Sequence, residues 1–248
     1  MPNIVEKSSR MVLMTAESND DLARIISAWF DASFWQDNQA IIGQSHGRNI
    51  TYFIDPNPIT KSNNSWVLRH YYRGGLYGKF NRDAFLYHGI ETTRAYQELS
   101  LLEKMREWNL PVPTPVAARV IRSGLFYRAD ILIEKIPNAD DCFQILRQRA
   151  LPKETWYDIG ATIFRLHHHN VFHSDLNIHN IMLDQHNKVW LIDFDKCGIR
   201  DDQATWKLEN LERLKRSLTK EKNLNDSFHY HSNDWKALLA GYQKGSLT

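Results

Sequence analysis

The sequence predicts an α+β fold with two lobes, a β-rich N-lobe with one main helix and a short helical C-lobe. Two observations favour this fold. Apolar runs of strand length recur before Pro137, and apolar residues recur mainly at helical spacing after it. The change of pattern falls at 134–138, which is short enough to be a hinge. We therefore expect an N-lobe at 1–136, with an N-terminal helical extension at about 20–36, and a C-lobe at 137–248.

Within the N-lobe, a helix is expected from Asp20 to Trp35, because Leu22, Ile25, Ile26 and Trp29 share one face. A longer helix is expected over 92–108, where Tyr96, Leu99, Leu102 and Met105 recur at helical spacing and a proline-rich segment follows. Five apolar runs predict strands. They lie at 40–43, 50–54, 66–72, 116–121 and 126–133.

Within the C-lobe, helices are expected at 140–149, 154–169 and 206–218. Two short apolar runs, 181–183 and 189–192, flank the polar residues 184–187. This pattern predicts a hairpin of two buried strands.

Length and composition place the chain among ordinary globular proteins. It has 248 residues, of which 42% are apolar and 24% charged, so it can bury a large core without disulfides. Its two cysteines, Cys142 and Cys197, favour a reducing compartment. We find no signal peptide and no apolar run of about 18 residues. The expected place is the cytosol, or a membrane surface facing it.

The net charge of +2 says little, but the charges are unevenly distributed. No acidic residue occurs between Pro56 and Arg82, whereas five basic residues do. A second basic run, Lys207–Lys222, contains several glutamates. Each run fits either a solvated surface or an anionic partner, such as a nucleotide, a phosphorylated substrate or an acidic lipid surface.

The most informative stretch runs from His173 to Asn180 and is followed by Asp193-Phe194-Asp195. The patterns H-x-D-L-x-x-x-N and D-F-x are those with which kinase-type phosphotransferases place a catalytic carboxylate and two metal ligands. The predicted hairpin brings Asn180 and Asp193 close together. We predict that Asp175 accepts the proton of an attacking hydroxyl and that Asn180 and Asp193 bind Mg²⁺. Taken singly, each residue also fits a turn or a strand end.

These motifs resemble the protein-kinase-like superfamily, and together with further residues of the chain they are most similar to its bacterial lipopolysaccharide-core kinases, above all those that act on 3-deoxy-D-manno-octulosonic acid (Kdo). The resemblance covers roughly residues 38–220. It is carried by the motifs above together with Trp66–Leu76, Glu98, Val112–Pro115 and Asn210–Leu218.

The resemblance implies a bilobal kinase-like fold, with ATP and Mg²⁺ as cofactors. It implies transfer of the γ-phosphate to the 4-hydroxyl of Kdo on a Kdo-linked lipid A precursor. It further implies a cytoplasmic enzyme, peripheral at the cytoplasmic face of the bacterial inner membrane. An anionic membrane surface is then a partner, and nucleic acid is not.

The resemblance also assigns nucleotide-binding residues. Arg69 stands where the family's usual phosphate-binding lysine lies, and Glu98 stands where its ion-pair partner lies. Lys79 is an alternative phosphate ligand. The remaining assignments are Gly43 and Gly47 in a loop over the phosphates, Glu134 and Ile136 at the adenine, and Arg73, Lys79 and Arg82 facing the anionic acceptor.

Two departures from protein kinases are informative. Ser174 stands where regulated protein kinases carry arginine, so we do not expect control by a phosphorylated activation loop. Asn177 stands where Ser/Thr kinases carry lysine, which argues against a protein substrate. Two alternatives remain open. One is a small-molecule kinase of the aminoglycoside or choline type, and the other is an inactive kinase-like binding module.

The histidines His167, His168, His169, His173 and His179 also suggest a metal site, but three consecutive histidines on a helix point in different directions. No cysteine or carboxylate stands at zinc spacing around them. We expect His173 to brace its loop and His167 to interact with the dipole at a helix end.

Overall fold

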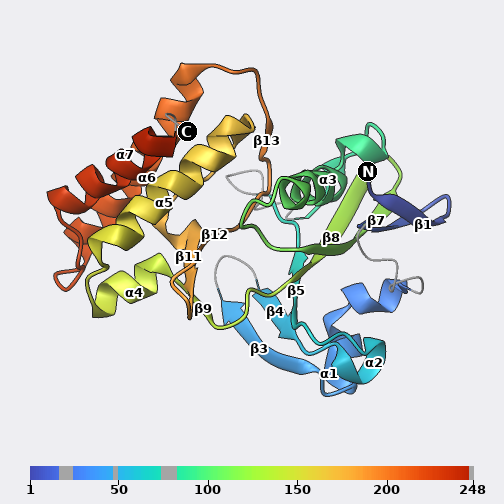
Figure 1. Ribbon diagram of the computed structural model, residues 1–248. Coiled ribbons are helices and arrows are strands. Elements are labelled where there is room, and N and C mark those ends of the chain that lie inside the picture. The colour runs from blue at the N-terminus through green and yellow to red at the C-terminus, as the bar shows by residue number, and fades with distance from the viewer. Residues whose placement is uncertain (17–24, 47–49, 74–82, 246–248) are drawn as a thin grey trace. The chain divides into compact units, whose positions relative to one another are not determined.

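The structure is a computed structural model that describes residues 1–16, 25–46, 50–73 and 83–245 (Figure 1). The chain divides into two compact units. The first comprises Met1–Lys104 and Pro113–Pro137, and the second comprises Met105–Val112 and Asn138–Thr248. The main change of unit thus falls at Pro137, inside the short connection at which the sequence pattern changes.

An antiparallel sheet forms the centre of the first unit, with strand order β1-β2-β7-β8-β5-β4-β3 and with β6 paired to β8. The strands are β1 Asn3–Lys7, β2 Met11–Thr15, β3 Ile41–His46, β4 Ile50–Ile54, β5 Trp66–His70, β6 Phe85–Leu86, β7 Pro115–Ser123 and β8 Phe126–Glu134. The predicted strands are confirmed. β1 and β2 were not among them. All residues of β1 are exposed and Val12 to Thr15 of β2 are buried in succession, so neither strand alternates between buried and exposed positions.

Three tryptophans form the core on one face of this sheet. Trp29 lies 5.6 Å from Trp66 and Trp35 lies 6.0 Å from it, measured between ring centroids. Residues 20–24 of the expected helix lie outside the described residues. Over the described part, the expectation of one continuous helix through Trp35 is wrong, because a 3-10 helix (Ser27–Phe30) and α1 (Ala32–Asp37) are separated by an extended Asp31. Six residues apart, the two tryptophans would point to different sides of a continuous helix. The break lets both rings reach Trp66.

The opposite face of the sheet carries α3 (Arg94–Glu107), which confirms the long helix predicted here. Side chains alternate along β5, so Trp66 and Leu68 point into the tryptophan core and Arg69 points to the other face. Arg69 meets Glu98 of α3 there. A short helix, α2 (Asn57–Thr60), precedes β5.

The second unit is mainly helical, with α4 (Cys142–Gln148), α5 (Lys153–His168), α6 (Ala204–Leu224) and α7 (Ser232–Gly245). A small antiparallel sheet has the order β12-β11-β9, and β10 pairs with β13. These strands are β9 Ala139–Asp141, β10 Val171–Phe172, β11 Ile181–Asp184, β12 Val189–Leu191 and β13 Gly198–Ile199. The predicted hairpin is β11–β12, and the three predicted helices correspond to α4, α5 and α6.

Helices α5 and α7 lie side by side (Figure 1) and touch through glycines. A Cβ on Gly160 would lie 1.9 Å from the carbonyl oxygen of Leu238, and one on Gly241 would lie 1.9 Å from that of Tyr157. Helix α7 was not predicted, because the glycine inside it weakens an isolated helix and is explained only by this close packing.

None of the helices in the described part of the chain combines the length and the apolar character that crossing a membrane requires.

Candidate active site

The H-x-D-L-x-x-x-N segment forms a tight loop that leads into β11. A side chain of the loop itself stabilises this conformation. The Asn177 side chain accepts a hydrogen bond from the His179 amide at 2.9 Å and caps a 3-10 turn at Ile178–Asn180. The amide of Ile192 donates to the carbonyl of Asn180 at 3.1 Å. The β11–β12 hairpin therefore places Asn180 beside the residue that follows Ile192, which is Asp193.

The side chain of Asn180 is buried and faces the same loop. Its Nδ2 donates to the backbone carbonyl of Asp175 at 2.9 Å, and Asn177 Nδ2 donates to that carbonyl at 3.0 Å. Because Nδ2 is used in this way, the amide oxygen of Asn180 is directed away from Asp175. The structure thus brings together the three oxygen-bearing residues of the motif, Asp175, Asn180 and Asp193, within the second unit.

Asp193 has a left-handed backbone, with φ of 64°. A non-glycine residue in this region costs roughly 1–2 kcal/mol, and such strain persists where the surroundings fix it. The next residue, Phe194, supplies one such constraint. Its ring is buried and lies 5.0 Å from the His173 ring. The backbone turn at Asp193 is therefore held by the core beneath the loop.

His173 braces the loop, as predicted. Its ring is completely buried, and burial holds the pKa of its imidazole below the usual range. The neutral ring has one donor and one acceptor, and both are used. Nε2 donates to the carbonyl of Ile192 at 3.0 Å, and Nδ1 accepts from the amide of Asp175 at 3.2 Å. One ring thereby couples the backbone of Asp175 to the residue before Asp193.

Asn210 of α6 holds His173 from the other side. Its Oδ1 accepts from the His173 amide at 3.1 Å, and its Nδ2 donates to the His173 carbonyl at 3.0 Å. The same Oδ1 lies 3.3 Å from Nε2 of His167, whose Nδ1 meets the Tyr242 hydroxyl at 2.9 Å. A buried hydrogen-bond network therefore connects α5, α6 and α7 to the loop that carries Asp175.

This network corrects the prediction for His167. Burial lowers the pKa of His167 to about 4, so the ring is neutral at physiological pH and cannot complement the dipole of α5 as a cation. Its role is that of a buried hydrogen-bonding group between Asn210 and Tyr242.

Asp175 itself is half-exposed and faces Arg213 of α6. Nε and Nη2 of Arg213 donate to Oδ1 of Asp175 at 3.1 and 2.6 Å. Burial acts to raise the pKa of the Asp175 carboxyl, but the hydrogen bonds and charge of Arg213 outweigh it, and the pKa lies below its ordinary value. Sequence reasoning missed this role of Arg213, because an exposed basic residue on a helix has the pattern of a solvated face.

In the first unit, the predicted pair of Arg69 and Glu98 is brought together. Arg69 Nη2 forms an ion pair with Oε1 of Glu98, which is almost fully buried. Oε2 of Glu98 accepts from the hydroxyl of Tyr71 at 2.7 Å. The guanidinium groups of Arg69 and Arg94 both lie 5.4 Å from the centre of the Tyr71 ring. The buried carboxylate of Glu98 thus fixes the direction of the Arg69 side chain.

The predicted phosphate loop differs from expectation. β3 continues to His46, so Gly43 lies inside a strand rather than in the loop. It sits where the register with β4 shifts, and a Cβ there would lie 3.2 Å from the Phe53 ring. The five residue pairs that join β3 to β4 outweigh the turn tendency of a single glycine. Gly47, Lys79 and Arg82 lie outside the described residues.

The residues expected at the adenine lie at the end of β8 and just after it. The amide of Glu134 donates to the carbonyl of Thr114 at 2.8 Å, and the amide of Lys135 donates to the backbone carbonyl of Ser65 at 2.7 Å. The described residues provide no such partner for the amide of Ile136. Arg73, expected at the acceptor, has its guanidinium carbon 5.4 Å from the centre of the Phe85 ring.

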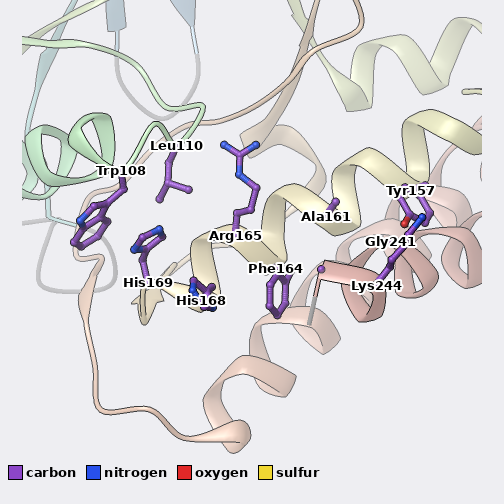
Figure 2. Close-up of a pocket in the computed structure, with 11 residues that line it drawn as sticks. Trp108, Leu110, Tyr157, Ala161, Phe164, Arg165, His168, His169, Gly241 and Lys244 are labelled. Carbon is purple, nitrogen blue, oxygen red and sulfur yellow. The ribbon is translucent and has the colours of Figure 1, made fainter. Parts of the chain in front are cut away.

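A separate pocket of about 460 Å³ lies in the second unit (Figure 2). α5, α7 and residues 108–110 form its walls, and the Trp108 ring stacks on His169 with ring centroids 4.4 Å apart. His168, His169 and Arg165 line it together with Phe164. The predicted site residues are not among its lining residues, so this pocket is distinct from the site at Asp175.

Comparisons with known proteins agree with the motifs. The model of the lipopolysaccharide kinase (Kdo/WaaP) family matches residues 32–242. The 3-deoxy-D-manno-octulosonic acid kinase of Photobacterium profundum is 45% identical over 216 residues, which are 87% of this chain and 89% of that protein. That of Haemophilus influenzae is 45% identical over 221 residues, 87% and 90% of the two chains. The enzyme of the same name from Vibrio vulnificus is 44% identical over 216 residues, which are 87% of this chain and 89% of that protein. The chain belongs to the lipopolysaccharide kinase (Kdo/WaaP) family.

Proposed function

We propose that this chain transfers the γ-phosphate of ATP to the 4-hydroxyl of Kdo on a Kdo-linked lipid A precursor. The observation that carries the proposal is the convergence of Asp175, Asn180 and Asp193 on one loop system of the second unit. Family membership and the curated relatives that are named as kinases of this sugar acid support the choice of acceptor.

Asp175 is the proton acceptor in this proposal. Its ionised carboxylate accepts the proton of the sugar hydroxyl and orients the oxygen toward phosphorus, a contribution of roughly 10²–10⁴-fold in rate. Arg213 holds the pKa of this carboxyl below its ordinary value, and the hydrogen bond from the Asp175 amide to Nδ1 of His173 fixes the backbone. Both hydrogen bonds from Arg213 end on Oδ1, so Arg213 leaves Oδ2 for the acceptor.

Asn180 and Asp193 would hold Mg²⁺. The donor set fits this ion, because one carboxylate and one amide oxygen suffice beside phosphate oxygens and water. The amide of Asn180 is turned by its bond to Asp175, and the carboxylate of Asp193 is placed by a strained backbone. When bound, the ion supplies positive charge to the phosphate oxygens.

Arg69 would contact the phosphates of ATP, with its direction fixed by Glu98. Its planar fork can donate two parallel hydrogen bonds to phosphate oxygens. Lys79 remains the alternative phosphate ligand. The amide of Ile136 and the backbone of Glu134 would bind the adenine, and Gly43 and Gly47 would border the phosphates.

The acceptor is an acidic, lipid-linked sugar, so we infer a peripheral position at the cytoplasmic face of the bacterial inner membrane. Anionic membrane surface and lipid precursor are the partners of this proposal, and nucleic acid is not. Arg73, Lys79 and Arg82 are the basic residues proposed to face the acceptor.

The proposal is tested with γ-labelled ATP, Mg²⁺ and purified Kdo-linked lipid A precursor. Label should appear on the lipid, and NMR of the product should place it on the 4-oxygen of Kdo. An aminoglycoside and choline serve as control acceptors and should remain unlabelled. Label on a control acceptor with none on the lipid would instead favour the aminoglycoside- or choline-type kinase, and no transfer to any acceptor would favour the inactive binding module.

A further inference from the structure

Arg213 lies directly beside the residue that must touch the acceptor. Its guanidinium donates two hydrogen bonds to Oδ1 of Asp175, through Nε and Nη2. A hydroxyl that transfers its proton to Asp175 has to approach within hydrogen-bond distance of that carboxylate. Any acceptor bound for reaction therefore has Arg213 as an immediate neighbour.

The position of Arg213 is set by the packing of α6 along the loop. Residues three or four apart on this helix contact successive loop residues. Asn210 binds His173, Arg213 binds Asp175, and Ser217 accepts from the amide of Ile178 at 3.3 Å. The side chains of Leu211, Leu214 and Leu218 are buried. Because successive turns of α6 are held against the loop in this way, the helix places Arg213 beside Asp175.

The guanidinium can serve two acceptors at once. Arginine has five N–H donors, and the two bonds to Asp175 use those on Nε and one on Nη2. Among the described residues, none accepts from Nη1. The side chain is half-exposed. A carboxylate that approached from solvent could therefore take parallel hydrogen bonds from the outer edge of the fork while Asp175 keeps its own.

The proposed acceptor carries such a group. In an octulosonic acid, the carboxylate is C1 and the reacting hydroxyl is on C4, with only C2 and C3 between C1 and C4. A sugar whose 4-hydroxyl meets Asp175 thus carries its carboxylate close to that aspartate. In addition, Asn177 provides no positive charge on the loop itself. A cation from α6 would lie beside two carboxylates, one from the enzyme and one from the substrate, and would reduce the repulsion between them.

We propose that Arg213 binds the carboxylate of the acceptor sugar and thereby selects acidic sugars over neutral ones. This inference rests on the proposed function and names the specificity residue of the same site. A purely structural role predicts something different, because an ion pair between half-exposed side chains contributes little to stability and has no effect on the choice of acceptor.

The test measures KM for the acceptor and for ATP in Arg213→Gln and Arg213→Lys. Loss of a hydrogen-bonded charge should raise the acceptor KM of Arg213→Gln by about tenfold to hundredfold, with a much smaller change in the KM for ATP. Arg213→Lys keeps the charge but not the fork, so its acceptor KM should lie between those of Arg213→Gln and the unaltered protein. Arg216→Gln is the matched control. It removes the same charge from an exposed site one turn further on, and its acceptor KM should be unchanged.

A second acceptor completes the experiment, namely the same lipid with the Kdo carboxyl reduced to an alcohol. The unaltered protein should prefer the acid by a factor similar to the loss in Arg213→Gln, and Arg213→Gln should show little preference. An unaltered protein that phosphorylates no Kdo lipid would overturn the proposed function itself. Transfer by the unaltered protein with an acceptor KM that Arg213→Gln leaves unchanged, or with a rise only in the KM for ATP, would overturn the role of Arg213 alone.

Discussion

Replacing Asn210 by alanine tests the buried network behind the loop that carries Asp175. Asn210 is 2% exposed and makes three hydrogen bonds, two with the backbone of His173 and one with the ring of His167. Alanine supplies neither donor nor acceptor. The amide and carbonyl of His173 and the Nε2–H of His167 would then be buried without a partner.

The expected cost follows from these groups. Each buried polar group left unpaired costs about 1–3 kcal/mol, and water entering the small space would recover part of it, so we expect a loss of about 3–5 kcal/mol. For a chain of this size each kcal/mol lowers the melting temperature by about 2–4 °C. Asn210→Ala should therefore melt about 10 °C below the unaltered protein.

Circular dichroism melting measures this change. Glu212→Ala, at an exposed position of the same helix, serves as the control and should shift the melting temperature by less than about 1 °C. Below its melting temperature Asn210→Ala should also have a lower kcat, because the brace on His173 and Asp175 is loosened. A destabilisation of less than about 1 kcal/mol would refute the view that the network holds the loop.

Three further predictions concern packing, pH and the metal. Gly241→Ala should destabilise the protein by about 3 kcal/mol or more in denaturant unfolding, because the new Cβ would overlap the carbonyl of Tyr157. The control is Gly198→Ala, whose Cβ would have no atom within 4 Å and which should change the free energy of unfolding little. Equal destabilisation by the two variants would contradict the packing argument. The pKa of His167 is lowered from 6.5 to about 4 on folding, so between these pH values the unfolded state binds more protons than the folded state. The protein should therefore lose about 3 kcal/mol of stability as the pH falls through this range. In melting experiments at several pH values His167→Gln should show a smaller loss, and a loss equal to that of the unaltered protein would argue against a buried neutral ring. Asp193→Asn, which tolerates the left-handed backbone, should raise the Mg²⁺ concentration for half-maximal activity at least about tenfold without lowering the melting temperature; an unchanged Mg²⁺ dependence would show that the metal is held elsewhere.

Local pattern was sufficient for much of the second unit. The apolar runs on either side of residues 184–187 predicted the β11–β12 hairpin, and the hairpin alone determines that Asn180 and Asp193 are neighbours. The long helix α3 followed from its apolar spacing, and its pairing with Arg69 followed from the family resemblance.

Tertiary contacts decided what the sequence could not. The break at Asp31 lets two tryptophans reach one partner. Asp31 is the N-cap residue of α1, a local start signal that the apolar spacing on both sides of it obscured. Burial, which sequence pattern does not report, turns His167 into a neutral group. Arg213 is one of several basic residues on α6, and only the packing of this helix against the loop distinguishes it from Arg216.

The most direct test of the central claim is phosphate transfer by Asp175→Asn. This variant keeps the shape of the side chain and removes its basicity, so transfer of label from ATP to Kdo-linked lipid should fall by about 10²–10⁴-fold, with the melting temperature nearly unchanged. Asp226→Asn, the same replacement at an exposed position, should transfer label at the normal rate. Transfer by Asp175→Asn at a rate close to that of the unaltered protein would contradict the assignment of Asp175 as the catalytic base.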